Sequence, residues 1–441
     1  MKSSSPACAI PPHRPADLLT CYPREAGAGL LSLPSRTLDT DEIRLSQSPM
    51  RFLFALFFVL ALPHRICGAP TPPVVDFEMP ASGMVVVPAK GGVEFDAMFN
   101  GQGPFRLIFD SGASMNVVSP AVAKQLGLRP EGPVIQATGA GSSSVPTQAA
   151  NVAQVRIGDL VLHDQTFVVL PLPWGDRPGP VGAVGYELMK RLVVTVDYER
   201  DRLIFNAPLS FAYSGIGVKV PIEPTLPGVE VRASLNGASG IFGIDTGAED
   251  SLTVEQRFVS RQNLVKQLSP RYHGYSGSGV GGAEPESYYG RVETVRIGEA
   301  EVNHAIVFLC DGQAISPDNA GNIGTRILRQ FNVTFDLPRG VLYFERNSNW
   351  GKPEVFNRAG IVVDSIQQDQ KVMTVLPGSP GEIAGVAIGD TIQKIDGRAP
   401  NDNPLQQDDP AFLQPVGTVV HLTVQRGDKI REIEVTLRDL L

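Results

Sequence analysis

Residues 106–113 read RLIFDSGA, and residues 241–248 read IFGIDTGA. Each stretch is an apolar run that enters an Asp-Ser-Gly or Asp-Thr-Gly turn. Taken singly, such a tripeptide is an ordinary turn, because Asp side chains bond their own backbone and Gly supplies positive φ. Two of them at matching places in two similar segments require a further explanation.

Other landmarks repeat in the same order around these turns. The sequence VRIG occurs at 155–158 and again at 295–298. Asp245 follows Asp110 by 135 positions, a spacing close to that between the two VRIG segments. Because several landmarks share one order and nearly one offset, we interpret the middle of the chain as an internal repeat.

The pattern within each copy favours β-strands. The segments VEFDAMF and VEVRASL alternate apolar and polar residues before an Asn-Gly pair, at 100–101 and 236–237. This arrangement is a strong hairpin signal. Another hairpin tip is expected at 158–159. Short helices are expected only at 120–128, 186–192 and 325–331.

The two repeated turns supply Asp110 and Asp245 as candidate catalytic residues. Two carboxyl groups a few ångströms apart in a cleft share one proton, because both cannot ionise comfortably there. The charged one can then take a proton from a bound water while the other donates to a peptide carbonyl.

Six further residues are expected to support these turns. The Ser or Thr hydroxyl can bond to the other lobe, and Gly leaves room where two backbones meet. Ala in the last place offers the carboxylate no hydroxyl donor, so the pKa values should be higher and the pH optimum mildly acidic. The supporting residues are Ser111, Gly112, Ala113, Thr246, Gly247 and Ala248.

These motifs resemble the aspartic peptidase clan, and in particular the bacterial retropepsin-like and pepsin-like proteins that carry both lobes on one chain. A second shared feature is an apolar pair plus Gly that leads into a short helix, at 183–185 and 322–324. The resemblance implies an aspartic endopeptidase that needs no cofactor.

The resemblance also implies flaps, which are hairpins that close over the substrate, and an acidic residue (Glu249 or Asp250) that pairs with Arg326. Two flexible surface loops are the alternative to flaps. The candidate flap residues are Gly139, Gly141, Gly277 and Gly279.

The C-terminal part resembles a bacterial PDZ domain, through the successive motifs PGSP, AGV, GD and IDG between 377 and 397. PDZ domains bind an extended peptide beside a sheet edge and capture its carboxylate with backbone amides. The resemblance implies a carboxylate loop near 358–361, with Gly360 and Ile361 as peptide-binding residues. The alternative is a small β-domain that only packs on the peptidase.

An uncharged apolar run of 11 residues, FLFALFFVLAL at 52–62, follows Arg51. It is too short to span a bilayer but has the length of the apolar region of a signal peptide. We therefore expect an exported protein, periplasmic or secreted, with no stable membrane span after signal removal. A buried strand or helix is the alternative.

Composition argues against several other functions. The net charge is −8 without a long basic run, so no nucleic acid partner is expected. The four cysteines show no CxxC pair, and the sequence has no HExxH or GxSxG motif. We expect no metal, no cofactor and no covalent nucleophile, and we expect a monomer.

The expected fold is mainly β, with two duplicated acid-protease-type lobes in a pseudo-twofold arrangement and a small PDZ-like, β-rich domain. The expected segments are a disordered or wrongly assigned extension at 1–49, a signal peptide at 50–69, peptidase lobes at 75–207 and 216–346, and the PDZ-like domain at 354–438.

The leading hypothesis is an exported aspartic endopeptidase that acts on peptides or proteins and whose PDZ module binds a peptide or protein segment. The alternative is a non-catalytic peptide-binding protein built on the same fold. A third hypothesis, in which each lobe dimerises with another chain, predicts that the two Asp residues lie far apart within one chain.

Overall fold

The computed structural model describes residues 76–175, 178–224, 228–312, 319–364, 370–400 and 408–441. The expected signal peptide and N-terminal extension lie outside these residues. In the part of the chain that is described, no helix is both long and apolar enough to cross a membrane.

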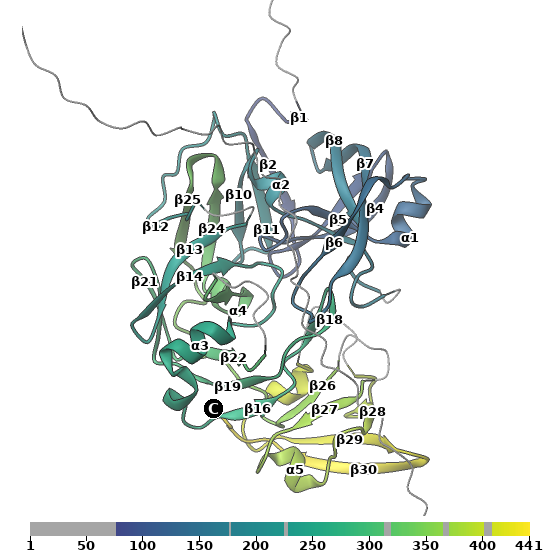
Figure 1. The fold of residues 1–441 in the computed structure, drawn as a ribbon, viewed down its shortest axis with the longest axis vertical. Helices are drawn as coiled ribbons and strands as arrows, with labels where there is room; N and C mark the ends of the chain where they lie inside the picture. Colours follow the sequence, from purple (N-terminus) through teal and green to yellow (C-terminus); the bar gives the residue numbers. More distant parts are fainter. Residues whose placement is uncertain (1–75, 176–177, 225–227, 313–318, 365–369, 401–407) are drawn as a thin grey trace, which may run out of the picture. The chain divides into compact units, whose positions relative to one another are not determined.

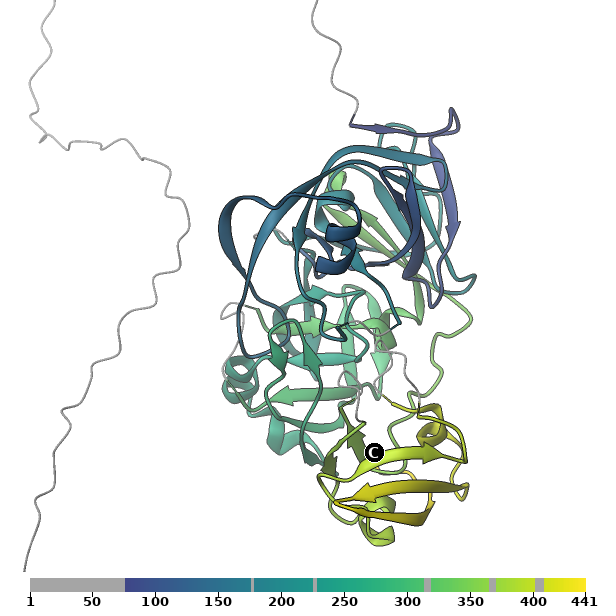
Figure 2. The same ribbon diagram turned by 90° about the vertical axis from the view of Figure 1, so that its right-hand side faces the viewer.

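A six-stranded sheet, in the order β12-β25-β24-β10-β11-β2, draws three strands from each half of the peptidase region. Figures 1 and 2 show the greener strands beside the bluer ones. The central pair is antiparallel, with Thr195 opposite Thr334 and their hydroxyl oxygens 2.9 Å apart. The strands are β2 (Met84–Pro88), β10 (Val193–Asp197), β11 (Arg202–Asn206), β12 (Val218–Pro221), β24 (Phe331–Asp336) and β25 (Val341–Arg346).

The first lobe contains an eight-stranded sheet in the order β1-β8-β5-β9-β4-β3-β7-β6. Its strands are β1 (Phe77–Glu78), β3 (Glu94–Phe99), β4 (Gln102–Phe109), β5 (Asn116–Val118), β6 (Glu131–Ala137), β7 (Val145–Ile157), β8 (Leu160–Val169) and β9 (Gly182–Val184).

The second lobe contains a nine-stranded sheet in the order β16-β19-β22-β15-β23-β14-β13-β20-β21, and a two-stranded hairpin, β17-β18. These strands are β13 (Glu230–Leu235), β14 (Ala238–Ile244), β15 (Leu252–Val254), β16 (Tyr272–Gly274), β17 (Ser278–Gly279), β18 (Gly282–Ala283), β19 (Ser287–Arg291), β20 (Thr294–Ile297), β21 (Ala300–Asn303), β22 (Ile306–Cys310) and β23 (Gly321–Ile323).

The two lobe sheets have the same pairing pattern. In the first lobe, β4 runs parallel to β9, and β5 lies antiparallel to β9 and parallel to β8. In the second lobe, β14 runs parallel to β23, and β15 lies antiparallel to β23 and parallel to β22. Duplication of one β-unit is our interpretation of this likeness.

The predicted hairpins are confirmed. β3 and β4 meet at Asn100-Gly101, and β13 and β14 meet at Asn236-Gly237. All four turn residues have positive φ, between 47° and 83°, which is the geometry that an Asn-Gly turn favours. The third hairpin turns at Gly158, where φ is 56°.

The helices are short, and one of them was not predicted. The predicted three are α1 (Pro120–Gln125), α2 (Tyr186–Met189) and α4 (Thr325–Leu328), and 3-10 turns occur at η1 (Leu264–Gln267) and η2 (Leu337–Arg339). The helix missed is α3 (Gln256–Gln262), whose first residue follows a Glu that makes no capping hydrogen bond. Its adjacent Phe258 and Val259 also favour a strand by propensity, so it gave little sequence signal.

The C-terminal module has a sheet of three strands and a separate strand pair, β26-β27. It has its own apolar core, which includes Val372, Phe412 and Leu422. Its elements are β26 (Ile361–Val363), β27 (Val372–Val375), α5 (Pro380–Ala384), β28 (Thr391–Ile395), η3 (Pro410–Leu413), β29 (Val419–Arg426) and β30 (Lys429–Thr436).

The fold is therefore mainly β, as expected. A single apolar core extends through both lobes and the shared sheet, and Phe109 and Phe335 meet edge to face in it, with ring centroids 5.6 Å apart. Both phenylalanines are fully buried. This core fixes the ends of β4 and β14, which carry the two Asp-containing turns.

Candidate active site

Asp110 and Asp245 directly follow β4 and β14, and equivalent hydrogen bonds hold them. The Asp110 amide donates to Val184 O (2.9 Å), and the Asp245 amide donates to Ile323 O (3.0 Å). Each carboxylate accepts through Oδ1 from the amides of the second and third residues after it, at 2.9 and 3.1 Å in both turns. The aspartate side chains thus fold back over their own turns.

The two carboxyl groups face each other across the lobes and hydrogen-bond to each other. A Cβ on Gly112 would lie 2.6 Å from Asp245 Cγ, and a Cβ on Gly247 would lie 2.5 Å from Asp110 Cγ. Glycine is therefore required at both positions, as predicted. The hypothesis that each lobe pairs with another chain is wrong, because it predicted carboxyl groups far apart.

The hydroxyls of the next residues tie the turns together. The Thr246 hydroxyl accepts from the Ser111 amide (2.9 Å) and donates to Phe109 O (2.6 Å). The Ser111 hydroxyl accepts from the Thr246 amide (3.0 Å) and donates to Ile244 O. Both side chains are buried, so this reciprocal set of bonds confirms the predicted locking of each turn to the other lobe.

The helix that follows Gly185 or Gly324 lies behind the corresponding turn; the second motif begins with the polar Asn322 rather than with an apolar residue. The Tyr186 amide donates to Ala113 O (3.0 Å), and the Thr325 amide donates to Ala248 O (2.8 Å). A Cβ on Gly185 would lie 2.3 Å from Asp110 O, so the glycine before the helix lets the helix approach the turn.

Burial raises the pKa of both aspartates above the ordinary range, because water no longer solvates their charged forms. The neighbouring charge of Asp245 raises the pKa of Asp110 further. Two interacting carboxyl groups of this kind titrate as a pair and hold one proton over an intermediate pH range.

The pair lies in a cleft of about 820 Å³ that both lobes line. Five of the six turn residues line it with the two aspartates, and Ser111 alone does not; the five are Gly112, Ala113, Thr246, Gly247 and Ala248. Trp174 of the first lobe also lines the cleft and donates its indole N–H to Pro180 O at 3.0 Å.

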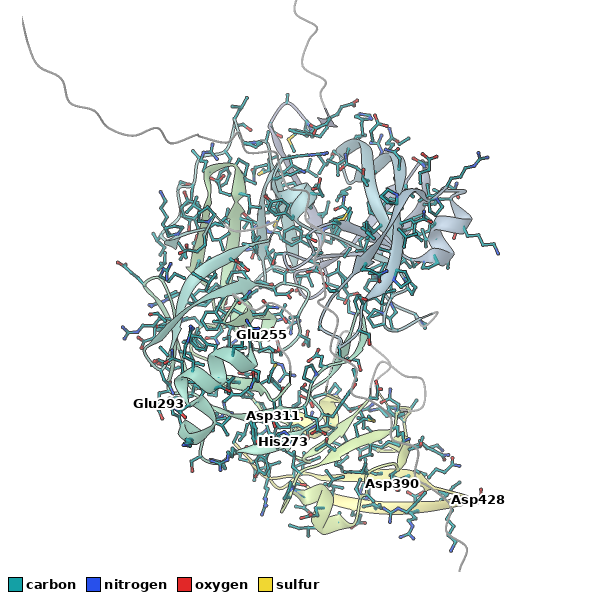
Figure 3. The ribbon with its side chains drawn as sticks, viewed as in Figure 1. Glu255, His273, Glu293, Asp311, Asp390 and Asp428 are labelled. Carbon is teal, nitrogen blue, oxygen red and sulfur yellow. The ribbon has the colours of Figure 1, made fainter. Side chains whose placement is uncertain are left out.

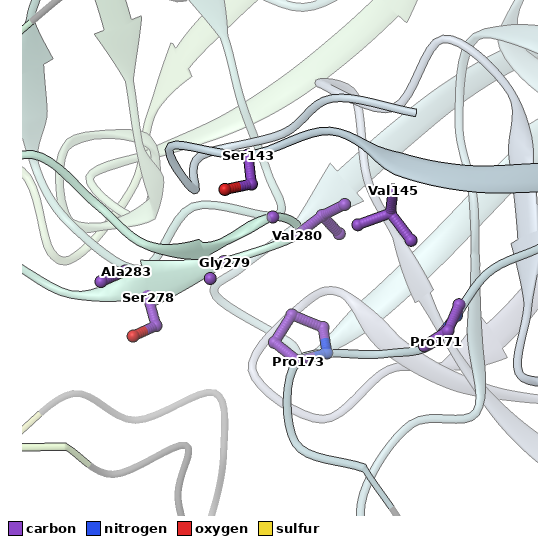
Figure 4. Close-up of a pocket in the computed structure, with 10 residues that line it drawn as sticks. Ser143, Val145, Pro171, Pro173, Ser278, Gly279, Val280 and Ala283 are labelled. Atoms are coloured by element: carbon purple, nitrogen blue, oxygen red, sulfur yellow. The ribbon is translucent and has the colours of Figure 1, made fainter. Parts of the chain in front are cut away.

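The predicted flap segments meet over the cleft. The Gly141 amide donates to Val280 O (2.9 Å), and the amides of Ser142 and Ser143 donate to Ala283 O (3.0 Å) and Gly281 O (3.1 Å). Figure 4 shows Ser143 of one loop close to Val280 of the β17-β18 hairpin, whose side chain points toward Val145; all three line a cavity of about 340 Å³.

Glycine is needed where the two loops touch. A Cβ on Gly141 would lie 2.3 Å from the Gly281 carbonyl carbon, and one on Gly139 would lie 2.7 Å from Val280 Cβ. A Cβ on Gly279 would lie 2.7 Å from Ala140 Cβ, whereas one on Gly277 would meet only Glu284 at 3.3 Å. The loops are thus paired segments rather than independent surface loops.

The predicted pairing of Arg326 with Glu249 or Asp250 is wrong. Arg329, three residues further along the chain, makes the two-fold ion pair with Glu249, with both N–O distances 3.2 Å. Arg326 instead lies 3.1 Å from Asp408 and 3.7 Å from Glu354, and its side chain is only 14% exposed. Two acids outside the repeats attract it, which the repeat alignment could not reveal.

Glu354 connects this arginine to the second lobe. Its carboxylate accepts from the Ser251 hydroxyl and from the Ile306 amide (3.0 Å). An apolar cluster that includes Tyr289, Phe308, Phe356 and Leu376 lies beside it. The segment after β25 is therefore built into the second lobe and is not a free linker.

The predicted carboxylate loop of the PDZ module precedes and begins β26. Gly360 has a φ of 66°, and Ile361 starts the strand. However, the amides of Ala359 and Gly360 already donate to Asn357 Oδ1, at 3.1 and 2.9 Å. An Asn side chain readily bonds amides just after itself, so a peptide carboxylate would have to displace Asn357 from these donors.

No group of three or more His, Cys, Asp or Glu side chains in the described ranges could hold a metal ion. His273 and Asp311, labelled in Figure 3, form a pair with His273 Nε2 3.1 Å from Asp311 Oδ2. Cys310 is a buried, free cysteine and belongs to no such group among the described residues. Most of the titratable side chains that line the cleft are carboxyl groups, beside Lys90, Arg329, Tyr275 and Cys310.

Two parts of the chain match models of known protein families. Residues 95–188 match the family model for an aspartyl protease, and residues 371–426 match the model for a PDZ domain. The chain therefore contains an aspartyl protease domain. It also contains a PDZ domain, so the sequence resemblance is confirmed in both parts.

Two individual proteins are similar over part of their length. A probable CtpA-like serine protease of Staphylococcus haemolyticus is 33% identical over 78 residues, which are 17% of this chain and 16% of that relative. The crystal structure of the aspartic proteinase from Irpex lacteus has a TM-score of 0.42 and 14% identity, covering 61% of this chain and 99% of that one.

Sequence reasoning missed several carboxyl groups that line the cleft, among them Asp250 and Glu284. Asp250 was considered only as a partner of Arg326, and Glu284 was not considered. The first could have been noticed, because the equivalent residue in the other repeat is Met115. The second lies after a Gly-rich segment whose path the sequence does not define.

Proposed function

We propose that this protein is an aspartic endopeptidase in which Asp110 and Asp245 activate a water molecule. The observation that supports it most strongly is the mutual contact of two partly buried carboxyl groups, each against the glycine of the other turn. The cleft around them is large enough for a segment of extended peptide.

The chemistry follows from one proton shared by two carboxyl groups. The charged carboxylate takes a proton from water while the water oxygen bonds to the peptide carbonyl carbon. The protonated carboxyl donates its proton to the carbonyl oxygen. Collapse of this intermediate breaks the C–N bond: the amine nitrogen leaves with the proton that came from water, and one hydroxyl of the intermediate returns a proton to the dyad, so that the acid product forms and the pair again holds one proton.

The test is digestion of a mixed peptide library by the wild type, by Asp110→Asn and by Asp245→Asn. We expect both variants to lose at least about 10³-fold in rate, since each removes one half of the acid–base pair. Asp96→Asn is the matched control, because Asp96 is an exposed carboxylate on β3. Cleavage that survives in either dyad variant, with folding intact, would refute the proposal.

A non-catalytic peptide-binding protein is the competing function. The Gly360 amide, which the PDZ module would need to bind a peptide carboxylate, already donates to Asn357, and this disfavours that function. If binding by the PDZ module were the whole function, library peptides would bind but no new termini would form at any pH between 3 and 8. The related protein named a serine protease matches over too little of its length to supply a mechanism here.

We further propose that the PDZ module binds a peptide or protein segment and that the protein acts as an exported monomer. Both carboxylates come from one chain, which supports activity without a partner subunit. Export is supported by the apolar run at 52–62, and N-terminal sequencing of the mature protein tests it.

A further inference from the structure

The flap of the second lobe, residues 275–286, begins directly after β16 and carries the β17-β18 hairpin. Its two arms are tied together near their root. The Glu284 amide donates to Gly277 O at 3.0 Å. The Ser276 hydroxyl donates to Pro285 O at 2.8 Å. Because the arms are braced in this way, the position of the root decides where the tip of the flap lies over the cleft.

The root residue, Tyr275, is held by three hydrogen bonds. Its amide donates to Thr374 Oγ1 at 2.9 Å, and its carbonyl oxygen accepts from the Tyr289 hydroxyl. Its own hydroxyl bonds to the hydroxyl of Ser278, further along the flap. Two of these partners belong to the second lobe. Thr374 lies on β27 of the PDZ module, so the third bond joins the flap to that module.

The contact between β16 and β27 is close and shielded from solvent. Both Tyr275 and Thr374 are buried. A Cβ on Gly274 would lie 2.6 Å from Oγ1 and from Cγ2 of Thr374, so the two strands approach too closely for a side chain at position 274. Loss of the Thr374 hydroxyl would leave a buried amide without this acceptor, and such a loss is costly.

A mixed apolar cluster holds the PDZ module against the second lobe at the same place. The ring of Tyr289 lies 5.4 Å from that of Phe308 and 6.3 Å from that of Phe356. Tyr289 therefore packs in the cluster through its ring and holds Tyr275 through its hydroxyl. The cluster joins Tyr289, Ile306 and Phe308 of the second lobe to Phe356, Leu376 and Leu440.

The active-site cleft extends to this contact. Tyr275 and Phe308 line it, and so does Val363, the last residue of β26 in the PDZ module. β26 pairs with β27, with Val362 opposite Thr374. The PDZ module thus contributes to the wall of the cleft and to the root of its flap, which a binding module on a free linker would not do.

We propose that the PDZ module is a working part of the peptidase, in which Thr374 is a positioning residue that fixes the root of the second-lobe flap. The inference rests on the proposed peptidase function and adds to it a role for the PDZ module beyond peptide binding. A flap that closes over a substrate orients it and excludes water, so a loosened root should weaken substrate binding.

Hydrogen exchange of the full chain, followed by mass spectrometry, tests the contact without any ligand. Thr374→Val keeps the shape of the side chain and loses the hydroxyl, and it should speed exchange across residues 275–286 at least about 10-fold. Thr374→Ser keeps the hydroxyl and should exchange like the wild type. Thr423→Val is the matched control, because the Thr423 hydroxyl donates to Glu432 (3.1 Å) within the PDZ module.

Steady-state kinetics separates positioning from general support of the fold. For the library peptide that the wild type cleaves fastest, Thr374→Val should raise KM about 3- to 10-fold and change kcat less than about twofold. Thr374→Ser should restore KM. A residue that only stabilised the fold would lower the amount of active enzyme, and hence the apparent kcat, without changing KM.

Gly274→Ala disturbs the same contact from the peptidase side and should reproduce both effects, so the test remains informative if Thr374→Val does not fold. Exchange across 275–286 that stays at the wild-type rate in the folded variants overturns the proposal, as does an unchanged KM. Faster exchange in a protein that hydrolyses no library peptide would support Thr374 at the flap root and reject the peptidase function. Hydrolysis with a normal KM in both variants would do the reverse.

Discussion

The first and second lobes hold their aspartates in the same way but differ in what surrounds them. Both turns have the same amide-to-carboxylate distances, 2.9 and 3.1 Å. A short helix, α2 or α4, lies behind each turn. Beyond the turns, the first lobe lines the cleft largely with apolar side chains and one acid, Glu94, whereas the second lobe contributes four acids and continues into the PDZ module. The equivalent turns match the equivalent roles that the proposed mechanism gives to the two aspartates. The residues that differ between the lobes are available to bind the substrate or to support the fold.

The largest expected effect tests the symmetric part. Gly112→Ala and Gly247→Ala each introduce a Cβ about 2.6 Å or less from the opposite carboxyl group. We expect both to lower kcat/KM by at least about 10²-fold, because a shift of about 1 Å in the reacting groups costs that much. Peptide hydrolysis measures the loss, and circular dichroism checks that the fold is kept. Near-normal activity of only one variant would mean that the turns are not equivalent.

The second prediction compares equivalent positions on the two capping helices. Arg326→Leu strands Glu354 and Asp408 without their cation, so we expect a loss of about 3–5 kcal/mol in the free energy of unfolding. Glu187 occupies the equivalent position on α2 and forms an exposed pair with Lys190. Glu187→Ala should change stability by less than about 0.5 kcal/mol.

Urea unfolding of the two variants and the wild type measures this difference. Equal effects at the two positions would show that the ion pairs of Arg326 with Glu354 and Asp408 do not stabilise the second lobe.

The third prediction concerns pH. Glu284 and Asp250 bind protons more tightly in the folded chain than in the unfolded one, so their contribution to stability is present at low pH and lost as pH rises. Stability should therefore fall between about pH 4 and pH 8. Glu284→Gln should flatten this fall, and Glu299→Gln, on the turn between β20 and β21, is the control. A variant whose thermal midpoint follows the wild-type pH curve would contradict the account.

The smallest expected effect is at the contact between the loops. Gly141→Ala should raise KM by about 2- to 10-fold, because its Cβ would displace the backbone that the other loop binds, at the cost of about one hydrogen bond. Ser142→Ala leaves the donating amide in place and should leave KM unchanged. Steady-state kinetics on one peptide distinguishes the two variants, and equal KM values would mean that the loops need not pair.

The sequence could predict what depends on local pattern. Asn-Gly pairs and alternating residues identified the hairpins, and two Asp-Ser/Thr-Gly turns at one offset predicted the facing carboxyl groups. The sequence could not predict the partner of Arg326, because Asp408 lies 82 positions away in another module. It also could not predict that Asn357 occupies the amide of Gly360, since such a short-range choice depends on the final loop conformation.

The pairing of β10 with β24 has a practical consequence for dissecting the molecule. Either lobe expressed alone would expose one of these strands along its edge, and an uncovered edge strand invites aggregation. Two fragments cut between β11 and β12, after Asn206 and before Val218, should instead recombine when refolded together. The peptidase region would then behave as a split enzyme, whose recovered hydrolysis reports that the two halves have met.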